Sequence, residues 1–309
     1  MIRDNRYPPG FAAATSAISA TLGPMVPPSI PMLFYALIAN ASVGALFLAG
    51  VLPAFLTAIM LMATIAIIAR RRSFPIEMPP PRTELFGIFI RALPPLLLPG
   101  ILLGIIYSGI ASPTEAAAIA AAYSLILAGI VYKTLSFRTL LDVISETVLQ
   151  TAAIGLIMAG AFVFNYAVAN EGVPRLISST LVAWQLSPIT FLLTVNFLLL
   201  VLAIFIDEIT ILLVIVPLLV PVAHNLGIDL VHFGIIIMMN MMIGLALPPH
   251  GLLLFVISNL TQIPVGKIFV ETPAFIATMI LMLLITTFWP SLALMLPRLA
   301  GYHLSLIHI

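Results

Sequence analysis

Long apolar segments separated by short polar loops fill most of the chain, and two of these segments are interrupted by proline and glycine. The interrupted segments are residues 11–40 and 231–260, and each contains a glycine followed four residues later by a double proline. Proline lacks the amide donor and clashes with the preceding helical turn, so neither segment can be one regular helix. We therefore expect two broken helices, with breaks at Gly23–Ser29 and Gly244–Gly251.

Similar residues flank the two breaks, which indicates an internal repeat. Gly244 lies 221 residues after Gly23 (244 − 23), and three matches downstream keep this spacing to within one residue. The matches pair Phe34 with Phe255, Val43–Phe47 with Val265–Phe269, and Pro53–Phe55 with Pro273–Phe275. Paired interrupted segments in two halves of a chain point to the binding site of a secondary transporter. The alternative is a pair of proline kinks that only shape the helix bundle.

The apolar pattern predicts an all-α polytopic membrane protein in three regions. Residues 1–72 form the end of a first repeat, residues 73–150 a scaffold with an amphipathic arm, and residues 151–301 a second repeat. The expected elements are the broken helix 11–40, a connector at 42–52, helix 53–69, the arm 137–150, helix 151–169, a re-entrant hairpin at 190–222, the broken helix 231–260 and helix 273–296. In the scaffold, Ser112 and Glu115 flank Pro113 as in a capping box, which predicts a helix start there.

Residues 190–222 carry two acidic residues in the middle of an apolar stretch. A straight helix of this length would extend about 50 Å, well beyond the ~30 Å hydrocarbon core. A re-entrant hairpin with Asp207–Thr210 at its tip resolves both the length and the buried charge. An ionisable residue at membrane depth is functional by default. The alternative is a tip held in a water-filled vestibule.

Composition and charge narrow the function further. Hydrophobic residues make up 62% of the chain and charged residues 7%, which excludes a water-soluble domain. The net charge of +1 gives no sign of nucleic-acid binding, and the absence of cysteine excludes disulfides and thiolate sites. If Arg70–Arg72 is cytoplasmic, 10 of the 12 Lys and Arg residues fall in cytoplasmic segments, as the positive-inside rule requires. These segments are 1–10, 70–91, 133–138 and 261–272.

Several motifs resemble the large, DctM-like membrane subunit of tripartite ATP-independent periplasmic (TRAP) transporters. Ser19–Ser29 resembles the family's S-S-T-x-G-P-x-x-P-P-S stretch, and Arg6–Ala14 is similar to its R-G-Y-x-P-G-F-A-A-A run. Ser112–Ala117 resembles its P-T-E-A-A motif. Leu226–Gly234 and Gly244–Gly251 complete the set, so the resemblance covers nearly the whole chain.

The resemblance implies an inverted-repeat, elevator-type transporter in the bacterial inner membrane. It implies sodium-coupled import of a small organic acid anion, such as a C4-dicarboxylate or sialic acid. The implied partners are a periplasmic solute-binding protein, which delivers the substrate, and a small four-helix membrane subunit. No ATP, redox cofactor or metal other than sodium as the coupling ion is implied.

The ends of the chain differ from the family pattern. Family members carry a further segment, including a first hairpin, before the position of Met1, so we expect an N-terminally truncated fragment. Residues 302–309 are unlike the family, and Leu304–Ile309 is what a common transposon sequencing-adapter end would encode. We therefore expect a non-native tail.

Three positions inside the motifs also depart from the family pattern. Ala20 replaces the second serine of the first stretch, and Leu247 replaces the threonine before the second double proline. Asp207-Glu208-Ile209-Thr210 replaces the more usual D-P-T-A. Ligation by backbone carbonyls could survive these changes, whereas ligation by side chains at these positions could not.

The candidate sodium ligands form two clusters, because sodium prefers several oxygens, which unwound backbone and nearby hydroxyls supply. The first cluster comprises Ser19, Thr21, Gly23 and Pro27, and the second comprises Asp207 and Thr210 at the hairpin tip with Asn240, Gly244 and Leu247 at the facing break. The alternative for the hydroxyls of the first cluster is that they cap the broken half-helix.

The candidate substrate residues are Pro28 and Ser29 in the first break and Pro249 and His250 in the second. The half-helices after Pro28 and Pro249 would direct their positive dipole ends at an anion. His250 could contact a carboxylate, respond to pH or face a vestibule without a role. The asparagines in apolar segments are expected to bridge helices rather than to bind substrate; these are Asn165, Asn196 and Asn259.

Other function classes fit the sequence less well. The chain has no H-E-x-x-H or G-x-S-x-G motif, and Glu208 is expected to point away from Asp207, so no acid dyad forms and we expect no enzyme. A channel or assembly protein would not need a repeated broken helix. Within transporters, the alternative is a stand-alone sodium–dicarboxylate or citrate symporter of the wider ion-transporter superfamily, which needs no binding protein.

Overall fold

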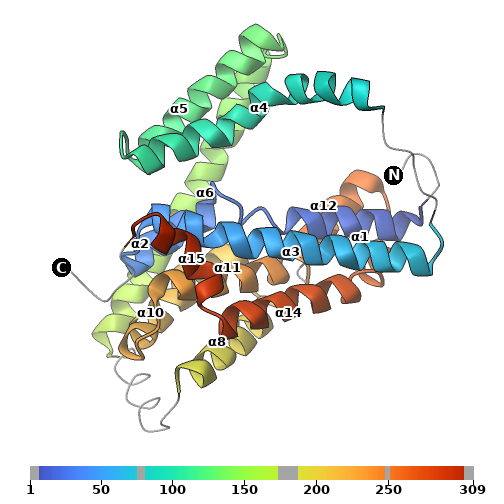
Figure 1. The fold of residues 1–309 in the computed structure, drawn as a ribbon. Coiled ribbons are helices and arrows are strands. Elements are labelled where there is room, and N and C mark those ends of the chain that lie inside the picture. Colours follow the sequence, from blue (N-terminus) through green and yellow to red (C-terminus); the bar gives the residue numbers. More distant parts are fainter. Residues whose placement is uncertain (1–6, 75–80, 173–186, 248–250, 303–309) are drawn as a thin grey trace. The chain divides into compact units, whose positions relative to one another are not determined.

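The computed structural model describes residues 7–74, 81–172, 187–247 and 251–302. Every regular element within these ranges is a helix, which confirms the prediction of an all-α protein (Figure 1). The chain forms two compact units, one of Met1–Pro75 with Ala161–Ile309 and one of Ile76–Gly160.

The larger unit contains most of the helices. They are α1 (Pro9–Ala20), α2 (Ile30–Ala39), α3 (Val43–Arg71), α8 (Pro188–Leu202), α9 (Glu208–Thr210), the π-helical turn η2 (Ile211–Ile215), α10 (Val216–Asn225), α11 (Leu230–Gly244), α12 (Leu252–Thr261), α13 (Val265–Phe269), α14 (Pro273–Phe288) and α15 (Ser291–Leu299). The smaller unit contains α4 (Arg82–Ser108), α5 (Pro113–Ile126) and η1 (Leu127–Val131), and α6 (Phe137–Asn170) belongs partly to each unit.

Within the described residues, five helical stretches are long and apolar enough to cross a membrane, and the bent pair α14–α15 makes a sixth candidate. Helices α2, α8, α11 and α12 are equally apolar but have only 10–17 residues. Such short helices fit the halves of broken spans, because a full crossing needs about 20 residues.

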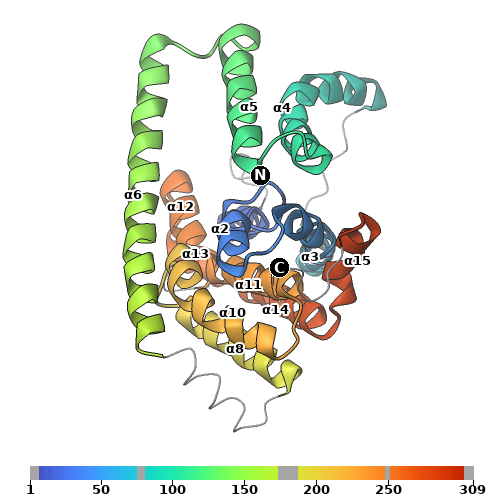
Figure 2. The ribbon, with the colours of Figure 1, turned by 90° about the vertical axis from the view of Figure 1, so that its left-hand side faces the viewer.

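Helix α11 is the core of the larger unit. All residues from Val231 to Ile243 are buried, and the helix contacts α2, α3, α8, α10, α14 and α15 (Figures 1 and 2). A helix that is hydrophobic all round is surrounded by other elements. The polar side chains on it, His232 and Asn240, therefore need internal hydrogen-bond partners.

Three segments with a predicted cytoplasmic location meet at the end of α3. Arg72 forms an ion pair with Glu271, with 2.8 Å between Nη1 and Oε2, and this hydrogen-bonded contact raises the pKa of the arginine. The rings of Tyr7 and Phe74 lie 5.7 Å apart, edge to face. These two contacts involve one or two residues from each of three segments with a predicted cytoplasmic location, 1–10, 70–91 and 261–272.

The structure differs from the expected elements at the connector 42–52. This segment is the first part of α3, which continues through Pro53 to Arg71. The Ser42 side chain caps the helix by accepting a hydrogen bond from the Ala45 amide, and the buried face that follows packs on α11 and α14. Tertiary packing here outweighs the loss of one backbone hydrogen bond at the proline.

Two further boundaries differ. The arm 137–150 and the helix 151–169 form one continuous helix, α6. The expected helix 273–296 is instead bent by 63° between α14 and α15. Pro290 causes this bend, because proline drives the residue before it, Trp289, out of the helical region, and Trp289 has φ −125° and ψ 77°.

The smaller unit confirms the predicted helix start at Ser112. Its side chain accepts a hydrogen bond from the Glu115 amide, and the Glu115 carboxylate accepts one from the Ser112 amide at 2.7 Å. The helix that follows, α5, packs on α4, and the Tyr123 hydroxyl donates to the Pro94 carbonyl at 2.9 Å. This hydrogen bond joins α5 to α4, which contains three prolines.

Gly50 gives a test of the packing around the first break. A Cβ at this position would lie 2.7 Å from the Met25 carbonyl oxygen, whereas a Cβ at Gly104 in α4 would meet nothing within 4 Å. We expect Gly50→Ala to destabilise the protein by about 1–3 kcal/mol through overpacking. Gly104→Ala should be neutral or stabilising, because alanine favours a helix over glycine by about 1 kcal/mol.

Thermal unfolding of the two variants in detergent measures the difference. An unfolding midpoint for Gly50→Ala at or above that of the wild type would show that α3 does not press against the break.

Candidate functional site

The break after α8 lies where the sequence predicts the hairpin tip. Residues 203–206 turn, and Asp207 then caps the short helix α9. Asp207 Oδ1 accepts hydrogen bonds from the amides of Ile209 (3.0 Å) and Thr210 (3.1 Å), and the Thr210 hydroxyl donates to Oδ2. Aspartate is a favoured residue at this position because its oxygens pair the free amides of the first turn. The cap places Glu208 at the first helical position.

The second break follows α11. The helix ends at Gly244, residues 245–247 turn, and α12 starts at Leu252. A Cβ on Gly244 would lie 2.7 Å from the Cβ of Ala203, so glycine lets the end of α11 touch the turn after α8. The two candidate substrate residues Pro249 and His250 lie outside the described residues.

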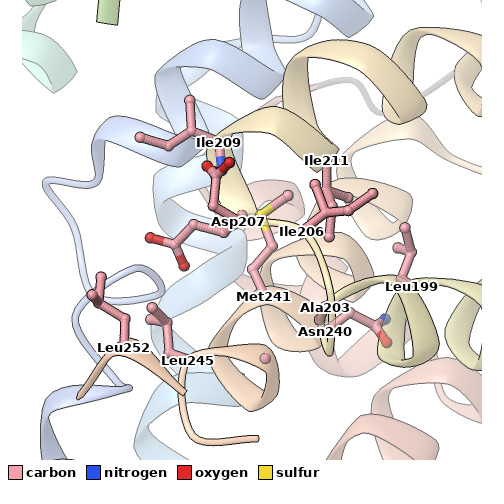
Figure 3. Close-up of a pocket in the computed structure, with 12 residues that line it drawn as sticks. Leu199, Ala203, Ile206, Asp207, Ile209, Ile211, Asn240, Met241, Leu245 and Leu252 are labelled. Atoms are coloured by element: carbon pink, nitrogen blue, oxygen red, sulfur yellow. The ribbon is translucent and has the colours of Figure 1, made fainter. Parts of the chain in front are cut away.

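A pocket of about 120 Å³ lies between these two breaks (Figure 3). Its described lining consists of Leu199, Ala203, Ile206, Asp207, Glu208, Ile209, Ile211, Asn240, Met241, Gly244, Leu245 and Leu252. Most of these residues are apolar, with a few polar groups among them, which is typical of small-molecule sites.

The pocket brings together three of the five predicted residues of the second sodium cluster: Asp207, Asn240 and Gly244. Thr210 and Leu247 are not part of the lining. Thr210 donates a hydrogen bond to Asp207, which is a lining residue. Glu208 also lines the pocket, although it was not among the predicted ligands.

A chain of buried hydrogen bonds ends at the pocket. Asn240 Nδ2 donates to Asn196 Oδ1 at 2.8 Å, and Asn196 Nδ2 donates to Thr287 Oγ1 at 2.9 Å. The three side chains come from α11, α8 and α14, so the chain joins three helices. Sequence reasoning did not connect Thr287 with the site, because threonine in an apolar helix has no signal of its own.

The prediction that asparagines bridge helices is confirmed for two of the three named. Asn196 makes the bonds just described, and Asn165 of α6 donates from Nδ2 to the Leu213 carbonyl of η2 at 2.8 Å. Both remain separate from the pocket lining.

The first break has a different character, with hydroxyl groups bonded to nearby carbonyls. Thr21 is fully buried and donates to the Ile18 carbonyl at 2.7 Å, and Ser19 donates to the Thr15 carbonyl at 2.7 Å. Ser29 caps α2, accepting from the Met32 amide and donating to the Pro24 carbonyl at 2.6 Å.

The other predicted residues of the first break lie in the turn between α1 and α2. Gly23 and Pro28 are exposed, and Pro27 is buried. None of residues 19–29 belongs to the pocket lining, so the pocket includes residues of the second predicted cluster and none of the first.

Comparison with known proteins places these features in a family. Residues 1–292 match the model of the tripartite ATP-independent periplasmic transporter, DctM component. The chain is 38% identical to the sialic acid TRAP transporter large permease protein SiaM of Vibrio cholerae, over 97% of this chain and 71% of that protein. It is 39% identical to the C4-dicarboxylate TRAP transporter large permease protein DctM of Pseudomonas aeruginosa, over 97% of this chain and 70% of that protein. It is 35% identical to the sialic acid TRAP transporter permease protein SiaT of Haemophilus influenzae, over 96% of this chain and 48% of that protein.

These relatives are transporter permeases and not enzymes, which agrees with the function class predicted from the residues. Together with the apolar helices, they identify a multi-pass protein of the bacterial inner membrane. The chain belongs to the DctM family of TRAP transporter large membrane subunits.

Proposed function

We propose that this chain carries out sodium-coupled import of a small organic acid anion, delivered by a periplasmic solute-binding protein. A small four-helix membrane subunit is the proposed second partner. The observation that carries the proposal is the pocket between the break after α8 and the break after α11, because discontinuous helices at membrane depth form the substrate and ion sites of secondary transporters.

The oxygen atoms at both breaks support sodium as the coupling ion. At the first break, the hydroxyl hydrogens of Ser19 and Thr21 are used in bonds to carbonyls, which leaves the oxygen lone pairs for a cation. In the pocket, Asp207 at the break after α8 and Asn240 near the end of α11 supply carboxylate and amide oxygens. Hard monovalent cations prefer such oxygen ligands.

Two observations support an organic acid anion as the solute. The first residue of the ten-residue helix α12, Leu252, lies in the pocket lining, so the positive end of this helix is directed to the pocket. The named relatives are permeases for sialic acid and C4-dicarboxylates, both of which carry carboxylates.

Uptake into proteoliposomes tests the proposal. We expect labelled organic acid to accumulate only when the protein, its small membrane subunit, the cognate binding protein and an inward sodium gradient are all present. Omission of the binding protein separates the two transporter classes. Sodium-driven uptake that is indifferent to any binding protein would establish the stand-alone symporter instead.

Asp207→Asn tests the second ion cluster with little effect on the fold. Asparagine is as good a helix cap as aspartate, so the substitution removes the charge and keeps the capping oxygen. We expect the sodium concentration for half-maximal uptake to rise about tenfold or more, which corresponds to about 1.4 kcal/mol.

Asp229→Asn is the matched control for that variant. Asp229 caps α11 in the same way, accepting from the amides of Val231 (2.8 Å) and His232 (3.2 Å), but it does not line the pocket. The sodium concentration for half-maximal uptake by the Asp229→Asn variant should stay within about twofold of the wild-type value. If this sodium concentration rose equally in the two variants, the weaker sodium dependence would come from weakened helix caps and not from a lost sodium ligand.

Thr21→Val tests the first cluster. The substitution keeps the shape of the side chain and removes the hydroxyl. We therefore expect the sodium concentration for half-maximal uptake to rise about tenfold. Thr57→Val is the control, because Thr57 is also fully buried and donates to a carbonyl at 2.7 Å, but in the middle of α3. A sodium dependence that is unchanged in Thr21→Val would remove this residue from the ion site.

A further inference from the structure

The segment Leu226–Gly234, which carries part of the sequence resemblance, contributes no residue to the pocket lining. It contains the start of α11, where Asp229 caps the helix and His232 is only 2% exposed. A buried histidine in an apolar helix needs a hydrogen-bond partner inside the protein. The identity of that partner shows what the side chain holds in place.

The partner of His232 is the carbonyl oxygen of Thr286 in the last turn of α14, 2.8 Å from Nε2. A carbonyl can only accept a hydrogen bond, so Nε2 carries the hydrogen. In a regular helix this carbonyl would accept from the amide four residues later, but that residue is Pro290, which has no amide hydrogen. His232 therefore supplies the hydrogen bond that is lost at the bend between α14 and α15.

The residue after Thr286 belongs to the chain of hydrogen bonds that ends at the pocket. The Thr287 hydroxyl donates to the Leu283 carbonyl at 2.7 Å, so its oxygen accepts from Asn196 Nδ2. Asn196 thereby presents its own oxygen to Asn240, which lines the pocket. The position of the last turn of α14 thus bears on where the two asparagines lie.

Contacts that do not involve α14 hold the start of α11 in place. Asp229 Oδ1 accepts a hydrogen bond from the His232 amide at 3.2 Å, and the Tyr35 hydroxyl of α2 donates to the Leu230 carbonyl at 2.6 Å. A Cβ on Gly234 would lie 2.5 Å from the Tyr35 ring, so glycine lets the tyrosine pack against α11. His232 therefore extends from a fixed helix start to the end of α14.

We propose that His232 is a positioning residue for the pocket and acts through the end of α14. Its hydrogen bond holds the last turn of this helix so that Thr287 meets Asn196 and the chain of bonds reaches Asn240. The effect on uptake rests on the proposed transport function, whereas the link between His232 and Thr287 does not.

Uptake into proteoliposomes, with the components named for the proposed function, tests the effect on the pocket. His232→Leu removes the hydrogen-bond donor, and His232→Gln keeps an amide donor in place of Nε2. Loss of a partner that orients binding residues typically changes affinity about tenfold or more. We therefore expect the sodium concentration for half-maximal uptake to rise about tenfold in His232→Leu and to stay within about twofold of the wild-type value in His232→Gln.

Tyr35→Phe is the matched control, because it also removes a hydrogen bond from a side chain to a carbonyl at the start of α11 but leaves α14 untouched. We expect its sodium dependence to match that of the wild type. If both His232→Leu and Tyr35→Phe lowered the thermal unfolding midpoint and left the sodium dependence unchanged, the role of His232 would be structural only and the proposal would be overturned. An equal rise of the half-saturating sodium concentration in both would overturn it as well, because the effect would then come from the start of α11.

A double-mutant cycle on the unfolding midpoint tests the route through Thr287 without any flux. Thr287→Val removes the acceptor for Asn196. If the two residues act together, the midpoint of the double variant His232→Leu/Thr287→Val should fall by less than the sum of the two single shifts. Additive shifts would overturn the proposal. If the wild type carried out no uptake, a non-additive cycle would still support the link, and the failure would count against the proposed transport function alone.

Discussion

Inside a membrane, every backbone and side-chain polar group has to find its partner within the protein, and this requirement shapes the larger unit. A broken helix frees amides and carbonyls that would otherwise be paired. Asp207 and Ser29 pair amides at the starts of α9 and α2, and Gly251 donates to the Leu247 carbonyl at 2.6 Å. The breaks are thus stable structures with their own hydrogen bonds, and they can hold ligand groups in fixed positions.

The same requirement explains the close packing around the breaks. Gly50 lets α3 approach the Met25 carbonyl, and Gly244 lets α11 touch Ala203. Close packing at these two positions covers part of the irregular backbone and keeps water and lipid from that part. Removal of water also strengthens the interactions between a bound ion and the oxygens at the site.

Patterns among residues close in sequence predicted where the helices break. The helix ends and the contacts that form the pocket depend on tertiary packing, which such patterns do not record. Proline and glycine located the interruptions in 11–40 and 231–260, and the acidic pair located the break after α8, because each signal comes from residues close in sequence. The predicted helix start at Pro53 was wrong, because packing of α3 keeps this proline inside a helix. The pocket itself was only partly predictable: the contact of Asn240 with Asn196 joins residues 44 positions apart, and no local pattern records it.

The first break and the pocket beside the break after α8 differ in charge, and this difference bears on the proposed transport of an anion. The first break offers hydroxyl groups and carbonyls, which are neutral, whereas the break after α8 offers two carboxylates to the pocket. Movement of unbalanced charge through a medium of low dielectric constant is costly. If the pocket with Asp207 and Glu208 takes up an anion, as we propose, negative charge is added to negative charge, and bound cations would offset it. Under the proposed function, cation binding at the breaks would therefore favour binding of the anion, and electrostatics would couple the two.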